Sequence, residues 1–113
     1  MKNRKKIAVI TGGAGFIGSH MVDLLLSKKY KVNVIDNLSG GHKKNLAHHK
    51  KNSDLKFEKI DICKLKKNHK FFKNVNYVFH FAGIGDIVPS IENPDNYMQT
   101  NIQGTVKVLE AAR

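Results

Sequence analysis

The chain has 113 residues, of which 41% are hydrophobic, and its formal net charge is +11. This length allows a single domain with a modest core, and no apolar run approaches the ~20 residues that cross a bilayer. The apolar run after the basic start "MKNRKK" is too short for a signal peptide, and the single Cys63 excludes an internal disulfide. We therefore expect a cytoplasmic protein with no membrane contact.

The positive charge is concentrated in one stretch of the chain. Eleven of the 20 basic residues lie between Lys43 and Lys73, where only three acidic residues interrupt them. Arginine, which is best suited to bidentate contacts with bases and phosphates, occurs only as Arg4 and Arg113. We interpret the lysines as a solvated face and expect no nucleic-acid partner. Nucleic-acid binding through this face is the alternative.

Strand-like and helix-like segments alternate through the first half of the chain. The segments "KIAVIT" (6–11) and "KVNVIDN" (31–37) predict buried strands, because they are apolar and contain β-branched residues. Between them, apolar residues recur at helical spacing and predict a helix from Gly15 to Lys28. The segment "GGHKKNLAHHKKN" (40–52) is polar and only weakly periodic, which favours a loop with a short helix.

The second half continues the alternation. We predict strands at "LKFEKIDI" (55–62) and "VNYVFHFAG" (75–83), and a short helix at "KLKKNHKFFKN" (64–74). Residues 93–113 predict a long amphipathic helix with Pro94 at its start. The apolar residues that share one face of this helix are Met98, Ile102, Val106 and Leu109.

This alternation predicts an α/β fold. Short connections between successive strands imply right-handed crossovers and a parallel sheet. We expect a Rossmann-type doubly wound sheet with strand order 3-2-1-4, of which residues 1–113 form only the N-terminal part, truncated in the fourth helix.

The stretch "TGGAGFIGSH" places four glycines between the first strand and the first helix. It fits the spacing G-x-G-x-x-G from Gly13 and the spacing G-x-x-G-x-x-G from Gly12. Asp36 ends the next strand, 18 residues after Gly18. Together these features predict a dinucleotide site, with the pyrophosphate at the helix N-terminus and the carboxylate on the adenosine ribose. A glycine turn with a chance aspartate is the alternative.

Each glycine has a separate expected role. Gly12 would allow a tight turn, Gly15 would let the backbone approach the pyrophosphate, and Gly18 would let helix and strand pack closely.

These landmarks resemble those of a known family. Together with "DNLSGGHKKNL", "DI" at 61–62, "FHFAG" and "PSIENPDNYMQTNIQGTVKVLEAAR", they are similar in order and spacing to extended short-chain dehydrogenases/reductases. Within that group they resemble the NAD-dependent sugar-nucleotide epimerase/dehydratase family, nearest to the UDP-glucose 4-epimerases. The resemblance implies NAD as cofactor, a nucleotide-sugar substrate and a homodimer for the full-length protein. It further implies a UDP-hexose (UDP-glucose or UDP-N-acetylglucosamine) 4-epimerase that transfers hydride transiently to NAD.

The resemblance also implies which residues contact the cofactor. Those at the pyrophosphate are Gly12, Gly15, Phe16, Ile17 and Gly18. Those at the adenosine ribose are Asp36 and Asn37, beside the loop residues Leu38, Ser39, Gly40 and Gly41. Those at the adenine are Asp61 and Ile62. Those along the nicotinamide half are Phe81, Ala82, Gly83, Ile84 and Gly85, which Asn101 joins from the long helix.

Several of these positions have a plainer interpretation. Asp61 could be a turn residue after a strand, and Ser90 could cap a helix rather than lie near the substrate. His80 lies among aromatic residues in a strand and is interpreted as a core histidine rather than a catalyst, and Gly104 as a close-packing residue of the long helix. The histidines at 42, 48, 49 and 69 have no acidic or cysteine neighbour at ligand spacing, so we expect no metal site.

No catalytic residue is assigned in this chain. In the family that it resembles, a Tyr-x-x-x-Lys pair supplies the base, and Val34, Phe81 and Asn101 stand four residues after the three tyrosines here. The segment "IGDIVPS" also lacks the lysine that galactose-type epimerases carry beside the nicotinamide. We therefore expect the NAD-binding N-terminal portion of a longer enzyme, without the catalytic segment and the substrate domain. A truncated, non-catalytic NAD-binding module is the alternative.

Overall fold

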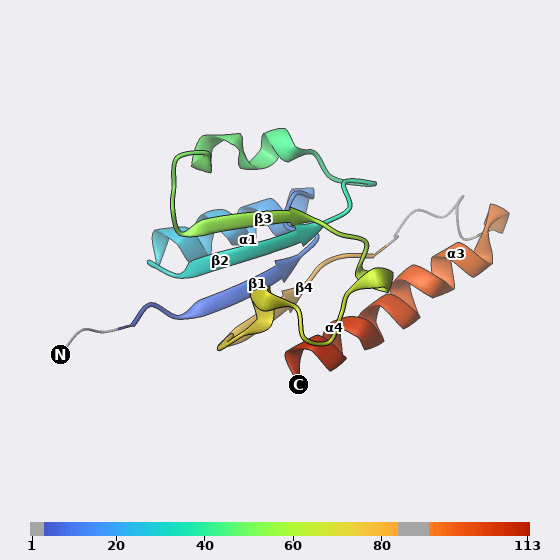
Figure 1. Cartoon of the computed structure of the whole chain (residues 1–113). Helices are drawn as coiled ribbons and strands as arrows, with labels where there is room; N and C mark the ends of the chain where they lie inside the picture. The colour runs from blue at the N-terminus through green and yellow to red at the C-terminus, as the bar shows by residue number, and fades with distance from the viewer. Residues whose placement is uncertain (1–3, 84–90) are drawn as a thin grey trace.

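Four parallel strands form the centre of the structure, a computed structural model that describes residues 4–83 and 91–113. They are β1 (Ile7–Thr11), β2 (Lys31–Asp36), β3 (Leu55–Lys59) and β4 (Tyr77–His80). Their order in the sheet is β3-β2-β1-β4, and every pairing is parallel (Figure 1). The predicted fold class and strand order are confirmed. The expectations for Ile84, Gly85 and Ser90 lie outside the described residues.

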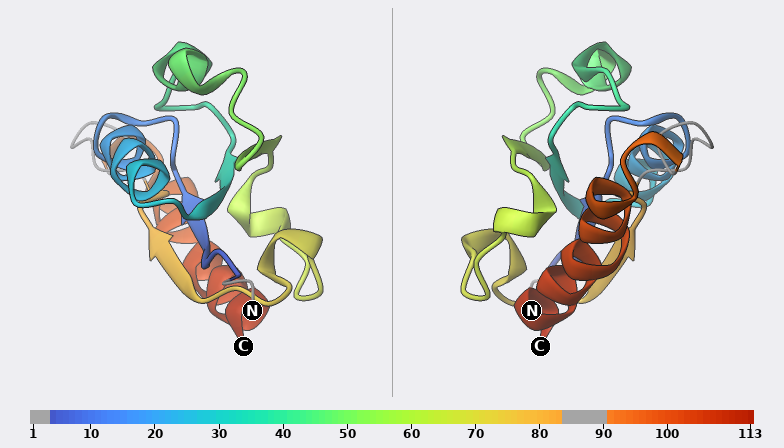
Figure 2. Two further views of the ribbon diagram at one scale, coloured as in Figure 1. Left: turned by 90° about the vertical axis from the view of Figure 1, so that its left-hand side faces the viewer. Right: turned by 90° about the vertical axis from the view of Figure 1, so that its right-hand side faces the viewer.

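The period-two alternation of the central strands supplies two cores, one on each face of the sheet. Ala8 and Ile10 pack against helix α1 (Phe16–Ser27), whereas Val9 on the opposite face packs against Val108 near the C-terminus. The sheet therefore lies between α1 and the C-terminal helix (Figures 1 and 2). This arrangement leaves the carboxyl ends of the strands free to form a site.

Short 3₁₀ turns replace the helix that the sequence predicted over residues 64–74. They are η2 (Ile62–Lys64) and η3 (Lys70–Phe72), and a longer 3₁₀ segment, η1 (Lys43–His49), follows β2. The α-helix prediction is wrong because local hydrogen bonds and packing compete with it. The His69 side chain accepts the backbone N–H of Phe71, and both Phe71 and Phe72 are buried in the core behind the sheet.

The C-terminal helix is continuous but changes its winding. It runs through α3 (Pro94–Met98), a π-helical segment η4 (Gln99–Gln103) and α4 (Gly104–Ala112). Pro94 lies in the first turn as expected, and Asn93 caps it by accepting the backbone N–H of Asn96. No helix within the described ranges combines the length and apolar character of a bilayer crossing.

The face of this helix that packs on the protein is not the apolar stripe seen in the sequence. Gly104, Val108 and Ala111 form the buried face. A Cβ on Gly104 would lie 2.5 Å from the Ile62 side chain, which confirms its role in close packing. The residues of the apolar stripe are 51–64% exposed: Met98, Ile102, Val106 and Leu109.

The glycine turn brings β1, β4 and α1 into direct contact. Gly12 has a φ of +71°, and a Cβ there would lie 2.8 Å from the backbone nitrogen of Ala82. A Cβ on Gly18 would collide with the carbonyl oxygen of Gly12. Gly12 therefore forms the tight turn and Gly18 the close helix–strand contact that the sequence predicted.

We predict that Gly18→Ala lowers the free energy of unfolding by about 3 kcal/mol, because the added methyl group meets rigid backbone. Gly40→Ala is the matched control, since no atom lies within 4 Å of a Cβ at that position. The control should change stability by less than about 0.5 kcal/mol. Urea unfolding of both variants measures the difference, and equal losses would refute the close contact at Gly18.

Candidate cofactor site

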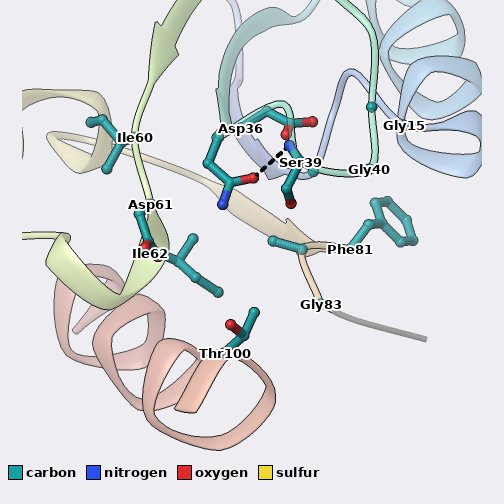
Figure 3. Close-up of a pocket in the computed structure, with 14 residues that line it drawn as sticks. Gly15, Asp36, Ser39, Gly40, Ile60, Asp61, Ile62, Phe81, Gly83 and Thr100 are labelled. Carbon is teal, nitrogen blue, oxygen red and sulfur yellow. Dashed lines mark hydrogen bonds between the residues drawn. The ribbon is translucent and has the colours of Figure 1, made fainter. Parts of the chain in front are cut away.

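A pocket opens at the carboxyl ends of the four strands (Figure 3). The lining residues that the sequence predicted are Gly12, Gly15, Asp36, Asn37, Ser39, Gly40, Asp61, Ile62, Phe81, Ala82 and Gly83. Gly41, which was expected in the loop beside the ribose, also lines the pocket, whereas Ile60 and Thr100 were not predicted. Five segments distant in the sequence thus meet in one pocket, the place where open α/β sheets bind ligands.

The remaining described residues of the prediction lie around the pocket but do not line it. Phe16 and Ile17, in the first turn of α1, are 79% and 64% exposed. Gly18 is buried against the glycine turn. Asn101 lies beside Gly83, where an added Cβ would be 3.1 Å from its side-chain oxygen. Leu38 contributes its backbone amide to the Asp36 carboxylate rather than its side chain to the lining.

Helix α1 begins directly after the glycine turn, where the Gly15 amide donates to the Gly12 carbonyl at 3.1 Å. Gly15 is the N-cap, no side chain caps the helix there, and its carbonyl accepts the amide of Ser19 at 2.9 Å. The first amides of a helix have no partner within the helix, and the helix dipole makes this end positive. This end of α1 is therefore suited to an anion such as a pyrophosphate.

The Asp36 carboxylate joins two segments of the pocket. Its Oδ2 accepts the backbone N–H of Ala14 at 2.9 Å, and its Oδ1 accepts that of Leu38 at 2.8 Å. Asp36 is 7% exposed, and Leu38 has a φ of +65° in the turn that it caps. A carboxylate oxygen has two lone pairs, so each oxygen retains one for a further donor such as a ribose hydroxyl.

Ala14 holds the ribose loop against the glycine turn. Its carbonyl accepts the backbone N–H of His42 at 3.0 Å and the side-chain amide of Asn45 at 2.8 Å. The loop is ordered further by a bond from the Ser39 N–H to the Asn37 side chain, drawn in Figure 3. Ala14 was not predicted as a site residue. Its one signal is that a residue other than glycine stands inside the glycine stretch.

Asp61 both caps a turn and lines the pocket. Its Oδ1 accepts the N–H of Cys63 at 2.9 Å, which starts η2, and Ile62 beside it is 4% exposed. The two interpretations of Asp61 are therefore compatible. Cys63 is half-buried, and burial, together with Asp61, raises the pKa of its thiol.

His80 is the centre of a hydrogen-bond chain behind the pocket. Thr105 donates its hydroxyl proton to the Asn101 carbonyl, so its oxygen must accept Nε2–H of His80 at 2.8 Å. The Nδ1 atom then carries no proton and accepts the Thr11 hydroxyl at 2.5 Å, and Thr11 accepts the N–H of Ala82. The chain connects β1, the pocket wall after β4 and the long helix.

This arrangement supports the interpretation of His80 as a core histidine. Burial lowers the pKa of His80 below its ordinary value of 6.5. Protonation would add a second ring N–H facing Thr11 and break the hydrogen bond that Nδ1 accepts from the Thr11 hydroxyl. Below pH 6.5 the unfolded chain therefore takes up this proton before the folded chain does, and stability falls as the pH decreases.

We predict that His80→Asn lowers the free energy of unfolding near pH 7.5 by about 1–3 kcal/mol, because an asparagine side chain can form only some of the hydrogen bonds that His80 makes. Between about pH 7.5 and 5.5 the variant should lose less stability than the wild type, since it lacks the titrating ring. Urea unfolding at both pH values tests this, with His42→Asn as the exposed control. Identical pH dependence in wild type and His80→Asn would contradict the prediction.

One expectation about the other histidines is wrong. The sequence showed no acidic neighbour for His48 and His49, but the fold brings both rings to Asp23 on α1, at 2.7 and 2.5 Å. His69 likewise pairs with Glu58 at 3.1 Å. Both carboxylates lie at least 11 residues away along the chain, so ligand spacing in the sequence could not reveal them.

Comparison with known proteins identifies relatives of this architecture. A putative UDP-glucose 4-epimerase of Methanocaldococcus jannaschii is 40% identical over 106 residues, which cover 93% of this chain and 33% of that protein. A solved UDP-N-acetylglucosamine 4-epimerase from Methanobrevibacter ruminantium, in complex with UDP-N-acetylmuramic acid, matches with a TM-score of 0.86. It is 38% identical, and the match covers 96% of this chain and 34% of that one.

A third relative has a different activity. The structure of DesIV, a dTDP-glucose 4,6-dehydratase from Streptomyces venezuelae with NAD bound, matches with a TM-score of 0.85 at 34% identity. It covers 94% of this chain and 35% of that one. The chain thus spans about a third of the length of these relatives.

A family model matches most of the chain and shows which family it belongs to. The model described as "NAD dependent epimerase/dehydratase family" matches residues 8–113. This range includes the glycine turn, Asp36, the Asp61 turn and the long helix. The predicted family and its cofactor, NAD, are confirmed, and the chain belongs to the NAD-dependent epimerase/dehydratase family.

Proposed function

We propose that this chain is the NAD-binding N-terminal portion of a UDP-hexose 4-epimerase, with UDP-glucose or UDP-N-acetylglucosamine as the substrate class. The observation that carries the proposal is the pocket itself. It combines a helix N-terminus without a capping side chain, a buried carboxylate at the end of β2 and an aspartate–isoleucine pair after β3. Two of the relatives described above are 4-epimerases, which favours this activity over dehydration.

Each part of the pocket suits one part of the cofactor. The amides of the first turn of α1 would hold the pyrophosphate, and Asp36 would accept the adenosine ribose hydroxyls. Asp61 and Ile62 would hold the adenine by a hydrogen bond and by packing. The nicotinamide half would extend along the wall from Phe81 to Gly83. NAD, when bound, would take up hydride from the sugar carbon and return it.

The chemistry on the sugar needs residues that this chain does not contain. We expect the Tyr-x-x-x-Lys pair and the sugar-binding domain in the remaining two thirds of the relatives' length. Two alternatives would use the same NAD-binding portion. One is a dehydratase, and the other is a non-catalytic NAD-binding module, which would need no catalytic residues. We further propose that the protein is located in the cytoplasm and that it has no nucleic-acid partner.

The cofactor part of the proposal predicts selectivity set by Asp36. The wild type should bind NAD at least about tenfold more tightly than NADP, because a 2′-phosphate would meet this carboxylate. Asp36→Asn should reduce that ratio and weaken NAD binding, since the amide cannot accept from both Ala14 and Leu38. Asp61→Asn is the matched control: it lies at the adenine, common to both cofactors, and should leave the ratio unchanged.

Calorimetric titration with both cofactors measures these ratios. Equal affinities for NAD and NADP in the wild type would remove Asp36 from the ribose site.

For the activity, the longer protein should interconvert UDP-hexoses that differ at C4, and the 113-residue chain alone should show no turnover. Turnover by residues 1–113 alone would contradict the proposal, and a purified longer protein that binds NAD without turnover would favour the binding module.

We also propose that the longer protein is a homodimer, with the exposed stripe of α3, η4 and α4 in its interface. A stripe of Met98, Ile102, Val106 and Leu109 on one helix face is costly to leave in water. Ile102→Glu should shift the longer protein toward the monomer in analytical ultracentrifugation, because the charge would be buried in the interface. Gln103→Glu, on the exposed neighbouring position, is the control, and a dimer unaffected by Ile102→Glu would contradict the proposal.

A further inference from the structure

Three side chains with metal-ligand atoms meet between α1 and η1, away from the cofactor pocket. Asp23 lies on α1, and His48 and His49 end η1. The Nε2 atoms of the two rings lie 2.7 and 2.5 Å from the same Asp23 oxygen, Oδ1. One ligand atom from each residue lies within 4.8 Å of the other two.

We propose that Asp23, His48 and His49 form a binding site for a divalent transition-metal ion, with Zn²⁺ as the best match. Two imidazole nitrogens and one carboxylate oxygen are a ligand set that zinc accepts, with a water molecule in the fourth position. Mg²⁺ and Ca²⁺ prefer oxygen ligands and fit this set poorly. This site is separate from the NAD pocket, and the proposal does not depend on the proposed function.

The hydrogen bonds of the cluster converge on one oxygen atom. Asp23 Oδ1 faces the Nε2 atoms of both rings, so each ring donates Nε2–H to it. On metal binding, the proton of each ring would occupy Nδ1 instead, which frees Nε2 as a ligand.

The geometry needs only a small adjustment. Ligand atoms in a tetrahedral zinc site are about 3.3 Å apart, which follows from bond lengths of about 2.0–2.2 Å. The present hydrogen bonds are shorter, so the carboxylate oxygen would have to move away from each ring by less than about 1 Å. The ring ligand atoms, which lie within 4.8 Å of each other, would also have to settle at about the tetrahedral spacing. The side chains of Asp23 and His48 are 45% and 56% exposed and are free to make this movement, whereas His49 is only 16% exposed and anchors the site.

The ion would strengthen a link between two segments that the hydrogen bonds of His48 and His49 to Asp23 already join. In the described structure, η1 is also anchored by Leu46 in the core and by the bond from Asn45 to the Ala14 carbonyl. The metal would replace the hydrogen bonds to Asp23 with coordination bonds between η1 and α1. Lys50 and Lys51 follow the histidines in sequence and oppose a cation, so we expect binding weaker than in a closed four-ligand structural site.

Titration of the tag-free protein with ZnCl₂ tests the proposal. Calorimetry should show one saturable equivalent, and zinc should raise the melting temperature of the wild type. Asp23→Asn and His48→Gln should each weaken binding at least about tenfold and abolish the zinc-dependent rise in melting temperature. With Co²⁺ as the probe, the wild type should show the visible absorption of a tetrahedral site.

Two control variants isolate the cluster. His42→Gln removes an exposed histidine outside it, and Cys63→Ser removes the thiol of the chain, a group that zinc also binds. Both should bind zinc as the wild type does. The proposal is overturned if the wild type shows no saturable zinc binding, or if the His48→Gln protein, folded by circular dichroism, binds zinc with unchanged affinity. Loss of binding in Cys63→Ser alone would equally reject it.

Discussion

The contact between the first turn of α1 and the end of β1 is the constraint on which the pocket depends. At Gly18 the helix backbone lies so close to the Gly12 carbonyl that no side chain fits between them. The same Gly12 touches the backbone of Ala82 after β4, in a conformation with positive φ. One turn therefore fixes the helix N-terminus, the end of β1 and the wall after β4 relative to one another, before any ligand binds.

A second, polar constraint positions the ribose loop. Ala14 donates its N–H to Asp36 and accepts bonds from His42 and Asn45, so one residue of the glycine turn binds both ends of the loop. The carboxylate of Asp36 is consequently oriented by backbone amides rather than by solvent. Backbone donors of this kind are rigid, and a buried carboxylate held by them is pre-organised for a ligand. The side chain that we propose to set cofactor selectivity therefore also orders the loop.

The sequence predicted the parts of this structure that depend on local pattern. Strands such as 6–11 and 31–37 follow from apolar content, and the glycine spacing with Asp36 indicates the pocket. The 3₁₀ turn at Phe71 could not be predicted in this way, because adjacent buried aromatic rings are a property of tertiary packing. The same limit applies to Asp23, which meets His48 only when α1 and η1 come together. Thr100 was missed because helical periodicity predicts which residues share a face of the helix, but not which part of the protein that face contacts.

The π-helical segment η4 divides the C-terminal helix into two parts with different partners. Thr100 within it lines the pocket (Figure 3). Gly104 and Val108 after it pack on η2 and on the core behind the sheet. A π turn contains one residue more than an α turn, so it resets the rotational phase between the residues before and after it. In evolutionary terms, η4 is equivalent to a one-residue insertion, and losing a residue there would rotate α3 by about 100° against α4. The insertion therefore gives Thr100 at the pocket a different rotational position, relative to the core residues Gly104 and Val108, from the one that an uninterrupted α-helix would give it.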